Sequence, residues 1–172
     1  GRGFCAGQDL GDRNPDGEDW PPDLGHTLTT YFNPLVRLIT ELPMPVICAV
    51  NGVAAGAGAN LALACDMVLA AHTARFIQAF SKIGLVPDAG GSWALPNRVG
   101  LARAMGLALT GDPLDATEAV QWGLIWKSCP DEELMPTATA LAANFANGPT
   151  AAYAGTKSLM RAALSNLSLI HI

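Results

Sequence analysis

Short apolar runs that alternate with polar or glycine-rich turns predict an α/β core in the first part of the chain. Residues 46–50 and 67–71 are uninterrupted apolar runs that we interpret as buried strands of the parallel type. Between them, Asn51 and Gly52 turn the chain, and residues 56–65 have small side chains in a helical register. This order of strand, turn, helix and strand is typical of α/β proteins.

Helical patterns dominate the second part of the chain. Asp115 and Glu118 have the spacing of a capping box, which would open a short helix that Gly123 can close. Residues 124–126 are a third strand candidate. Longer helices are predicted at 100–109, 131–146 and 150–165, and one more lies in the first part of the chain, at 26–41. We therefore expect one domain over residues 1–172, with an α/β core over about 1–130 and a helical part over about 131–165.

The segment 11–25 breaks this pattern. It contains three prolines, three glycines and five acids, and its apolar residues follow no period. We expect an exposed loop there.

Composition excludes several classes of function. The 172 residues are 50% hydrophobic and carry a net charge of −5 without a cluster of Lys or Arg, so nucleic-acid binding is not expected. No apolar run reaches the roughly 18 residues that would span a membrane. The excess of apolar residues instead predicts contacts between subunits. The four cysteines lack metal-ligand spacing and predict reduced thiols in a cytoplasmic protein.

The glycine-rich turn at 51–58 is the first candidate for chemistry. A turn between a buried strand and a helix N-terminus presents unpaired backbone N–H groups, which favour an anion or a developing oxyanion. A dinucleotide fingerprint is disfavoured, because Leu61 stands where its third glycine would be. The alternative that small residues only allow close packing of helix and strand stays open.

Asp88 is the second candidate. It lies between Pro87 and the Ala89-Gly90-Gly91 turn, where an Asp is often a turn residue or a helix cap. Its apolar neighbours allow another interpretation, since a carboxylate withdrawn from water has a raised pKa that suits proton transfer near neutrality. The three histidines have no partner at a recognisable spacing and are expected to serve at the surface or in packing: His26, His72 and His171.

Three segments together resemble the enoyl-CoA hydratase/isomerase (crotonase) superfamily over nearly the whole chain: Phe4-x-Ala6-Gly7-x-Asp9-Leu10, the stretch from Pro45 to Asp66, and the turn that contains Asp88. The resemblance implies a core of ββα repeats with a helical C-terminal part, truncated at both ends. It also implies an oxyanion hole, formed by the backbone N–H groups of Gln8 and Ala57. The side chain at position 8 would then matter little, whereas a bulkier residue at 57 would crowd the thioester. Further substrate contacts are implied for Ala6, Asp9 and Gly56.

The positions at which this chain departs from the family pattern reduce the number of reactions that it could catalyse. Where the family's hydratases carry two glutamates that activate water, this chain has Asn60 and Phe80, neither of which can accept a proton from water. Asp88 falls where the family's isomerases carry a single acid and where its aryl-CoA dehalogenases carry a nucleophile. The residues of these segments are most similar to those of the family's isomerases of bacterial phenylacetate degradation, which act on ring-epoxidised phenylacetyl-CoA and on enoyl-CoA double bonds.

The resemblance thus predicts an acyl-CoA isomerase that holds an enolate in the oxyanion hole and moves a proton with Asp88. Coenzyme A enters as part of the substrate, and no metal or redox cofactor is expected. Two alternatives are an aryl-CoA dehalogenase, for which only His26 could be a second base, and a non-catalytic acyl-CoA-binding subunit. The full-length protein is expected to form a homotrimer or a hexamer.

Overall fold

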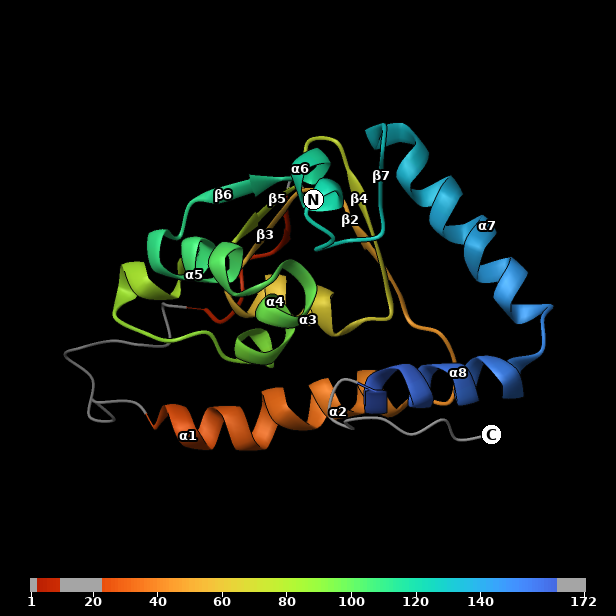
Figure 1. Cartoon of the computed structure of the whole chain (residues 1–172), viewed down its shortest axis with the longest axis horizontal. Coiled ribbons are helices and arrows are strands. Elements are labelled where there is room, and N and C mark those ends of the chain that lie inside the picture. The colour runs from red at the N-terminus through yellow and green to blue at the C-terminus, as the bar shows by residue number, and fades with distance from the viewer. Residues whose placement is uncertain (1–2, 10–22, 164–172) are drawn as a thin grey trace.

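The computed structural model describes residues 3–9 and 23–163, and its described strands form two sheets (Figure 1). In spatial order, the four-stranded sheet contains β1 (Gly3–Cys5), β3 (Val53–Ala55), β5 (Arg75–Ile77) and β6 (Pro113–Asp115). The three-stranded sheet contains β2 (Ile47–Val50), β4 (Met67–Ala71) and β7 (Lys127–Cys129). The described neighbours pair in parallel except β5 and β6, which are antiparallel.

Helices connect and cover these strands. The first helical stretch consists of α1 (Leu24–Thr27), the π-helical turn η2 (Leu28–Phe32) and α2 (Asn33–Glu41). The middle of the chain contains α3 (Ala57–Ala64), the 3-10 helix η3 (Ala79–Ile83), α4 (Gly91–Val99), α5 (Leu101–Thr110) and α6 (Ala116–Gln121). The last elements are the 3-10 helix η4 (Asp131–Glu133), α7 (Leu134–Ala146) and α8 (Thr150–Ala163).

The strands predicted at 46–50 and 67–71 are confirmed as β2 and β4, which pair in parallel and are covered on both faces. Alternate residues of each strand face opposite sides. Cys48 and Val50 point into the main core, whereas Ile47 and Ala49 pack against a second cluster that includes Leu134 of α7. Burial on both faces explains why these strands are continuous apolar runs.

The turn at Asn51-Gly52 moves the chain from one sheet to the other. β2 belongs to the three-stranded sheet, whereas β3, which begins at Val53, pairs with β1 and β5 in the four-stranded sheet. The sequence did not predict β3, because its three residues lie inside the glycine-rich turn and are too few to show a period.

The strand predicted at 124–126 is wrong. Leu124 and Ile125 lie in a turn and are only 1% and 4% exposed, and the strand β7 begins two residues later, at Lys127. The two side chains are apolar because they fill the main core, and burial does not require strand geometry.

The predicted helices are confirmed with small shifts at their ends. The short helix α6 begins as expected, since the carboxylate of Asp115 accepts a hydrogen bond of 2.8 Å from the N–H of Glu118. The helix α4 had not been predicted, because Gly90 and Gly91 stand at its start and Pro96 lies inside it. Most of the predicted loop at 11–25 lies outside the described residues.

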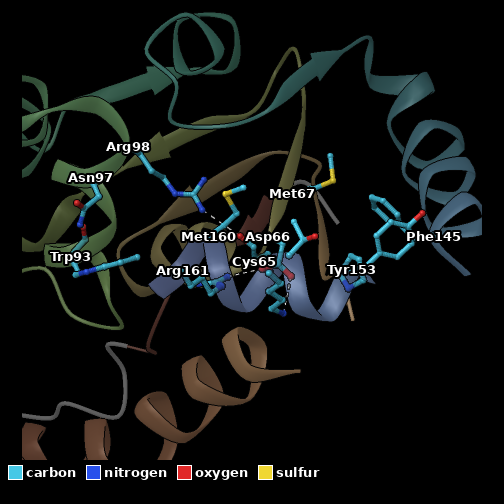
Figure 2. Close-up of a pocket in the computed structure, with 13 residues that line it drawn as sticks. Cys65, Asp66, Met67, Trp93, Asn97, Arg98, Phe145, Tyr153, Met160 and Arg161 are labelled. Atoms are coloured by element: carbon cyan, nitrogen blue, oxygen red, sulfur yellow. Dashed lines mark hydrogen bonds and ion pairs between the residues drawn. The ribbon is translucent and has the colours of Figure 1, made fainter. Parts of the chain in front are cut away.

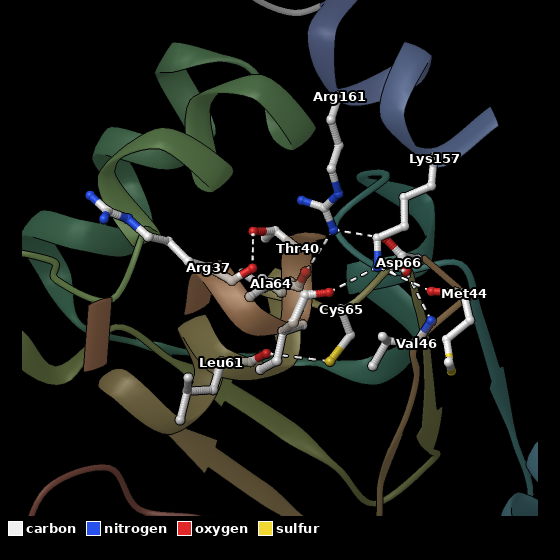
Figure 3. A network of polar contacts seen from close by, with 12 residues as sticks. Arg37, Thr40, Met44, Val46, Leu61, Ala64, Cys65, Asp66, Lys157 and Arg161 are labelled. Atoms are coloured by element: carbon white, nitrogen blue, oxygen red, sulfur yellow. Dashed lines mark hydrogen bonds and ion pairs between the residues drawn. The ribbon is translucent and has the colours of Figure 1, made fainter. Parts of the chain in front are cut away.

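The C-terminal helices pack on different parts of the molecule and meet at one side of it (Figure 1). α7 contacts β2 and β4, and α8 lies beside α2, where Lys157 donates a hydrogen bond of 2.8 Å to the carbonyl of Ile39. Figure 3 shows the carboxylate of Asp66 between Lys157 and Arg161, each 2.8 Å away. These ion pairs attach α8 to the junction of α3 and β4.

Candidate active site

Three segments that follow neighbouring parallel strands meet at one edge of the four-stranded sheet. Residues 6–8 follow β1, residues 56–57 follow β3, and residues 78–88 follow β5. The carboxyl ends of parallel strands point to the same edge of a sheet, which is where ligands bind in open α/β sheets. Strand order therefore brings together Gln8, Ala57 and Asp88, which lie far apart in the sequence.

Two glycines allow the first two segments to touch. A Cβ at Gly58 would lie 2.3 Å from the carbonyl oxygen of Cys5, so this backbone contact requires glycine. Gly7 has a φ of +88°, and a Cβ there would lie 3.2 Å from the main-chain nitrogen of Ala57. The chain around Gln8 is thus held against the first turn of α3.

A cavity of about 110 Å³ opens where the three segments meet. Besides Asp88, five residues were predicted to contact the substrate. Ala6, Gln8, Gly56 and Ala57 line the cavity, and Asp9 does not. The acid Asp88 lines it too; the side chain is half-buried, and its Oδ1 atom is shielded from solvent. The lining residues are Ala6, Gly7, Gln8, Gly56, Ala57, Ala79, Phe80, Ile83, Leu85 and Asp88.

The cavity is too small for a whole acyl-CoA, since pockets for drug-sized ligands measure about 300–1,000 Å³. It can enclose a thioester group and the carbon atoms next to it. Among its described lining residues, Asp88 is the one ionisable side chain. The chemistry that the lining can perform is therefore proton transfer at a single carboxylate, or nucleophilic attack by it.

The backbone after Asp88 is strained. Ala89 has a φ of 45°, and among the described residues it is the one non-glycine with positive φ. Strained backbone is found at functional sites when the surroundings hold it in place. Here the carbonyl oxygen of Asp88 accepts two hydrogen bonds, from the N–H of Gly91 at 2.7 Å and from the side-chain amide of Asn60 at 2.8 Å.

The two residues at the hydratase glutamate positions lie in different places. Phe80 is part of the cavity lining and presents an apolar ring. Asn60 is 1% exposed and does not line the cavity, because its side chain is engaged with the main chain of Asp88. Gln78, which the sequence analysis did not single out, donates a hydrogen bond of 2.9 Å to Asn60. No local sequence pattern could have identified Gln78, because Asn60 lies in α3, 18 residues away, and Gln78 follows β5.

The histidines lie outside this cavity wherever they are described. His26 and His72 are exposed, and the main-chain N–H of His26 donates to the N-cap carboxylate of Asp23 at 2.8 Å. His171 lies outside the described residues. Over residues 3–9 and 23–163, no group of three or more His, Cys, Asp or Glu side chains could hold a metal ion. In the same ranges, none of the helices is long and apolar enough to cross a membrane.

A larger cavity, of about 440 Å³, lies between α4, α7 and α8 and contains none of the predicted site residues (Figure 2). Its cations already have partners. Arg98 donates to the carbonyls of Leu63 and Leu124, and burial lowers the pKa of its guanidinium. Arg161 binds Asp66 and the carbonyl of Ala64. These two cations of the lining are therefore engaged within the protein.

The four cysteines are free thiols, as expected, and all except Cys5 are buried. Cys65 borders the larger cavity. A hydrogen bond with Cys48 lowers the pKa of Cys65 and raises that of Cys48. Neither thiol lines the smaller cavity that contains Asp88.

The sequence model of one protein family, enoyl-CoA hydratase/isomerase, matches residues 1–171. The chain belongs to the enoyl-CoA hydratase/isomerase family. It is 59% identical to the 1,2-epoxyphenylacetyl-CoA isomerase of Escherichia coli over 150 residues, 87% of this chain and 57% of that protein. It is 52% identical to a protein named as a probable enoyl-CoA hydratase from Rhodobacter capsulatus, over 96% of this chain and 63% of that protein.

The crotonase-type fold is confirmed by solved structures of the family. An enoyl-CoA hydratase from Mycobacterium avium subsp. paratuberculosis superposes with a TM-score of 0.86 and 41% identity, over 97% of this chain and 65% of that structure. The chain spans less than two thirds of these relatives. Since the family contains both hydratases and isomerases, membership alone does not select the reaction.

Proposed function

We propose that this chain carries the proton-transfer site of an acyl-CoA isomerase. The thioester carbonyl binds between the main-chain N–H groups of Gln8 and Ala57, and Asp88 removes a proton from the carbon next to it. The same carboxylate returns the proton at another carbon. The observation that carries this proposal is the cavity whose lining combines one carboxylate, that of Asp88, with Gln8 and with Ala57 at the start of α3.

The two N–H groups suit a developing oxyanion. Ala57 is the first residue of α3, so its N–H has no partner within the helix, and the helix dipole favours negative charge there. Gly7 keeps the neighbouring segment within contact of this nitrogen. Each donor in an oxyanion hole typically contributes about 10²–10³ in rate.

The cavity lining supports isomerisation over hydration. Addition of water to a double bond requires groups that position and activate the water, whereas the described lining offers Asp88 beside apolar side chains such as Phe80 and Leu85. A proton shift needs one acid-base group and leaves the oxidation state of the substrate unchanged, so the reaction as proposed requires neither a metal nor a redox cofactor.

For the substrate, we propose 1,2-epoxyphenylacetyl-CoA or an enoyl-CoA with a movable double bond. This choice rests on the identity of 59% to the Escherichia coli isomerase that bears the first name. Apolar residues on α5 and α8, such as Leu101, Leu109 and Met160, are between 67% and 69% exposed, which supports contacts between subunits. We propose a homotrimer or hexamer for the full-length protein. We also propose that the protein is cytoplasmic.

Solvent exchange tests the proposal directly. Full-length protein is incubated in D₂O with a 3-enoyl-CoA, and deuterium at the α-carbon and formation of the 2-enoyl isomer are followed by mass spectrometry and NMR. Asp88→Asn is expected to lower both rates by about 10²–10⁴-fold. Asp112→Asn, which changes an exposed acid outside the cavity, is the matched control.

The other outcomes identify the alternatives. Exchange that persists in the Asp88→Asn protein would overturn the role of Asp88. Addition of water to 2-enoyl-CoA faster than isomerisation would indicate a hydratase. Release of halide from a halogenated aryl-CoA would indicate a dehalogenase, and acyl-CoA binding without exchange in either protein would indicate a non-catalytic subunit.

A further inference from the structure

The side chains of Gln78 and Asn60 form a buried chain of amides that ends on the main chain of Asp88. We propose that Asn60, oriented by Gln78, is a positioning residue that fixes the direction of the Asp88 carboxylate. This inference rests on the proposed function, in which that carboxylate moves the proton. Neither amide lines the cavity, so both would act through Asp88 and not on the substrate.

The hydrogen bonds define one orientation for each amide. Gln78 donates from Nε2 to Oδ1 of Asn60 at 2.9 Å, and Asn60 donates from Nδ2 to the carbonyl of Asp88 at 2.8 Å. If the amide of Asn60 were reversed, its oxygen would face the carbonyl of Asp88 and its NH₂ would face the NH₂ of Gln78. Because an amide has donors on one side and acceptors on the other, Gln78 selects the orientation that Asp88 requires.

The orientation of Gln78 is maintained at a cost. Both side chains are buried, at 1% exposure for Asn60 and 3% for Gln78. The Oε1 atom of Gln78 is shielded from solvent and has no hydrogen-bond partner among the described residues. A buried acceptor without a partner is unfavourable, and such atoms are few in folded proteins. Gln78 therefore donates from Nε2 to Asn60 even though its Oε1 atom has no hydrogen-bond donor among the described residues.

The turn after Asp88 requires this support. Ala89 is held at a φ of 45°, which an L-residue adopts only when its surroundings impose it. The turn also lies directly against Asn60, because a Cβ at Gly91 would lie 2.2 Å from Nδ2 of that side chain. The hydrogen bond from Asn60 holds the peptide between Asp88 and Ala89. Rotation of that peptide would move the carboxylate of Asp88 relative to the cavity.

Substitutions that keep side-chain shape test the amide chain. In Gln78→Glu, position 78 offers only acceptors to Asn60, so the Asn60 amide is expected to reverse and place its oxygen against the carbonyl of Asp88. In Asn60→Asp, the donor itself is replaced. We expect both variants to lower kcat by about 10²-fold, the loss typical of a displacement of about 1 Å, with KM nearly unchanged.

The control is Asn147→Asp, which alters an exposed amide that also donates to a main-chain carbonyl, that of Ala143 at 2.9 Å. It should leave kcat and KM as they are. Circular dichroism of all variants of the full-length protein identifies any loss that is due to unfolding. A rise in KM without a fall in kcat, or normal kcat in the Gln78→Glu protein, would overturn the positioning role.

A crystal structure of the Gln78→Glu protein separates this inference from the proposed function. We expect the carboxylate of Asp88 to have turned away from Ala57 and the cavity. An unchanged carboxylate would refute the inference whatever the activity. If the carboxylate moves while the wild-type protein shows no exchange that depends on Asp88, the positioning holds and the proposed reaction fails.

Discussion

Lys157 of α8 and Asp66, the residue before β4, form an ion pair of 2.8 Å in which the lysine side chain is only 7% exposed. The ammonium group of Lys157 also donates to the carbonyls of Ile39 and Met44, at 2.8 and 3.2 Å. One lysine therefore joins the C-terminal helix to the end of α2, to the segment before β2 and to the start of β4.

Lys157→Met is expected to destabilise the fold. Methionine fills most of the space of the lysine but leaves two carbonyls without their donor, and Asp66 keeps only Arg161 and the main-chain N–H of Val46 as partners. Breaking a buried ion pair on one side typically costs about 3–5 kcal/mol, and the remaining Arg161 favours the lower end, about 3 kcal/mol. Urea unfolding followed by circular dichroism measures the change.

The control for this substitution is Lys127→Met, at an exposed position on β7. It should change the free energy of unfolding by no more than about 0.5 kcal/mol. Equal effects of the two substitutions would show that the contacts of Lys157 contribute no more than an ordinary surface lysine.

Gly91→Ala is expected to disturb the turn that contains Asp88. The new Cβ would lie 2.2–2.6 Å from three atoms of the Asn60 side chain, so either the amide or the turn must move. Overpacking of this kind costs about 1–3 kcal/mol, and the Asp88-dependent exchange rate should fall with it.

The matched substitution is Gly106→Ala in α5, where a Cβ would meet nothing within 4 Å. Alanine is a better helix former than glycine, so this variant should be more stable by about 0.5–1 kcal/mol and should retain the exchange rate. Thermal unfolding and the D₂O assay together decide the question. A Gly91→Ala protein that behaves like the Gly106→Ala protein would contradict the close contact with Asn60.

Thr73→Ala is expected to change how stability depends on pH. The hydroxyl and the N–H of Thr73 both donate to the carboxylate of Asp131, which lowers the pKa of Asp131. A group whose pKa is lowered in the folded state contributes stability at pH values above its unfolded pKa of about 3.9, and loses it as the pH falls through the folded value.

The pKa of Asp131 should therefore rise toward its ordinary value in the Thr73→Ala protein, as an NMR titration of the carboxyl carbon would show. The difference in unfolding free energy between this variant and the wild type should be full at neutral pH and shrink below about pH 4. Thr73→Ser keeps the hydroxyl and should titrate like the wild type. A titration of the Thr73→Ala protein that matches the wild type would contradict the assigned cause.

Sequence patterns predicted those strands and helices whose pattern of apolar residues matches the faces that are buried in the structure. Residues 47–50 and 67–71 are apolar on both faces because both faces are covered, and the run itself reveals this. The same reasoning failed at Leu124 and Ile125, where apolar side chains report burial in a turn. Short strands such as β3 and β6 have three residues each and carry no period.

The candidate site was predictable only in part. Local patterns singled out Asp88 and the turn that contains Ala57, the family resemblance added Gln8, and all three residues line one cavity. Their roles stay predictions, as does the expected contact of Asp9 with substrate. The bond from Asn60 to Asp88 depends on the packing of α3 against a turn 28 residues away in the chain, and no local pattern encodes that distance.

The five-residue π-turn η2 joins α1 and α2 into one helical rod that passes close to the Asp88 turn, since a Cβ at Gly90 would lie 3.7 Å from Val36. Such a turn accommodates one residue more than an α-helical turn does. Deleting one residue within Leu28–Phe32 would convert this stretch to a regular α-helix. The same faces of α1 and α2 would still point toward the protein and toward solvent. Removal of one residue from η2 would therefore shorten the connection from α1 to α2 without rotating Val36 away from the Asp88 turn.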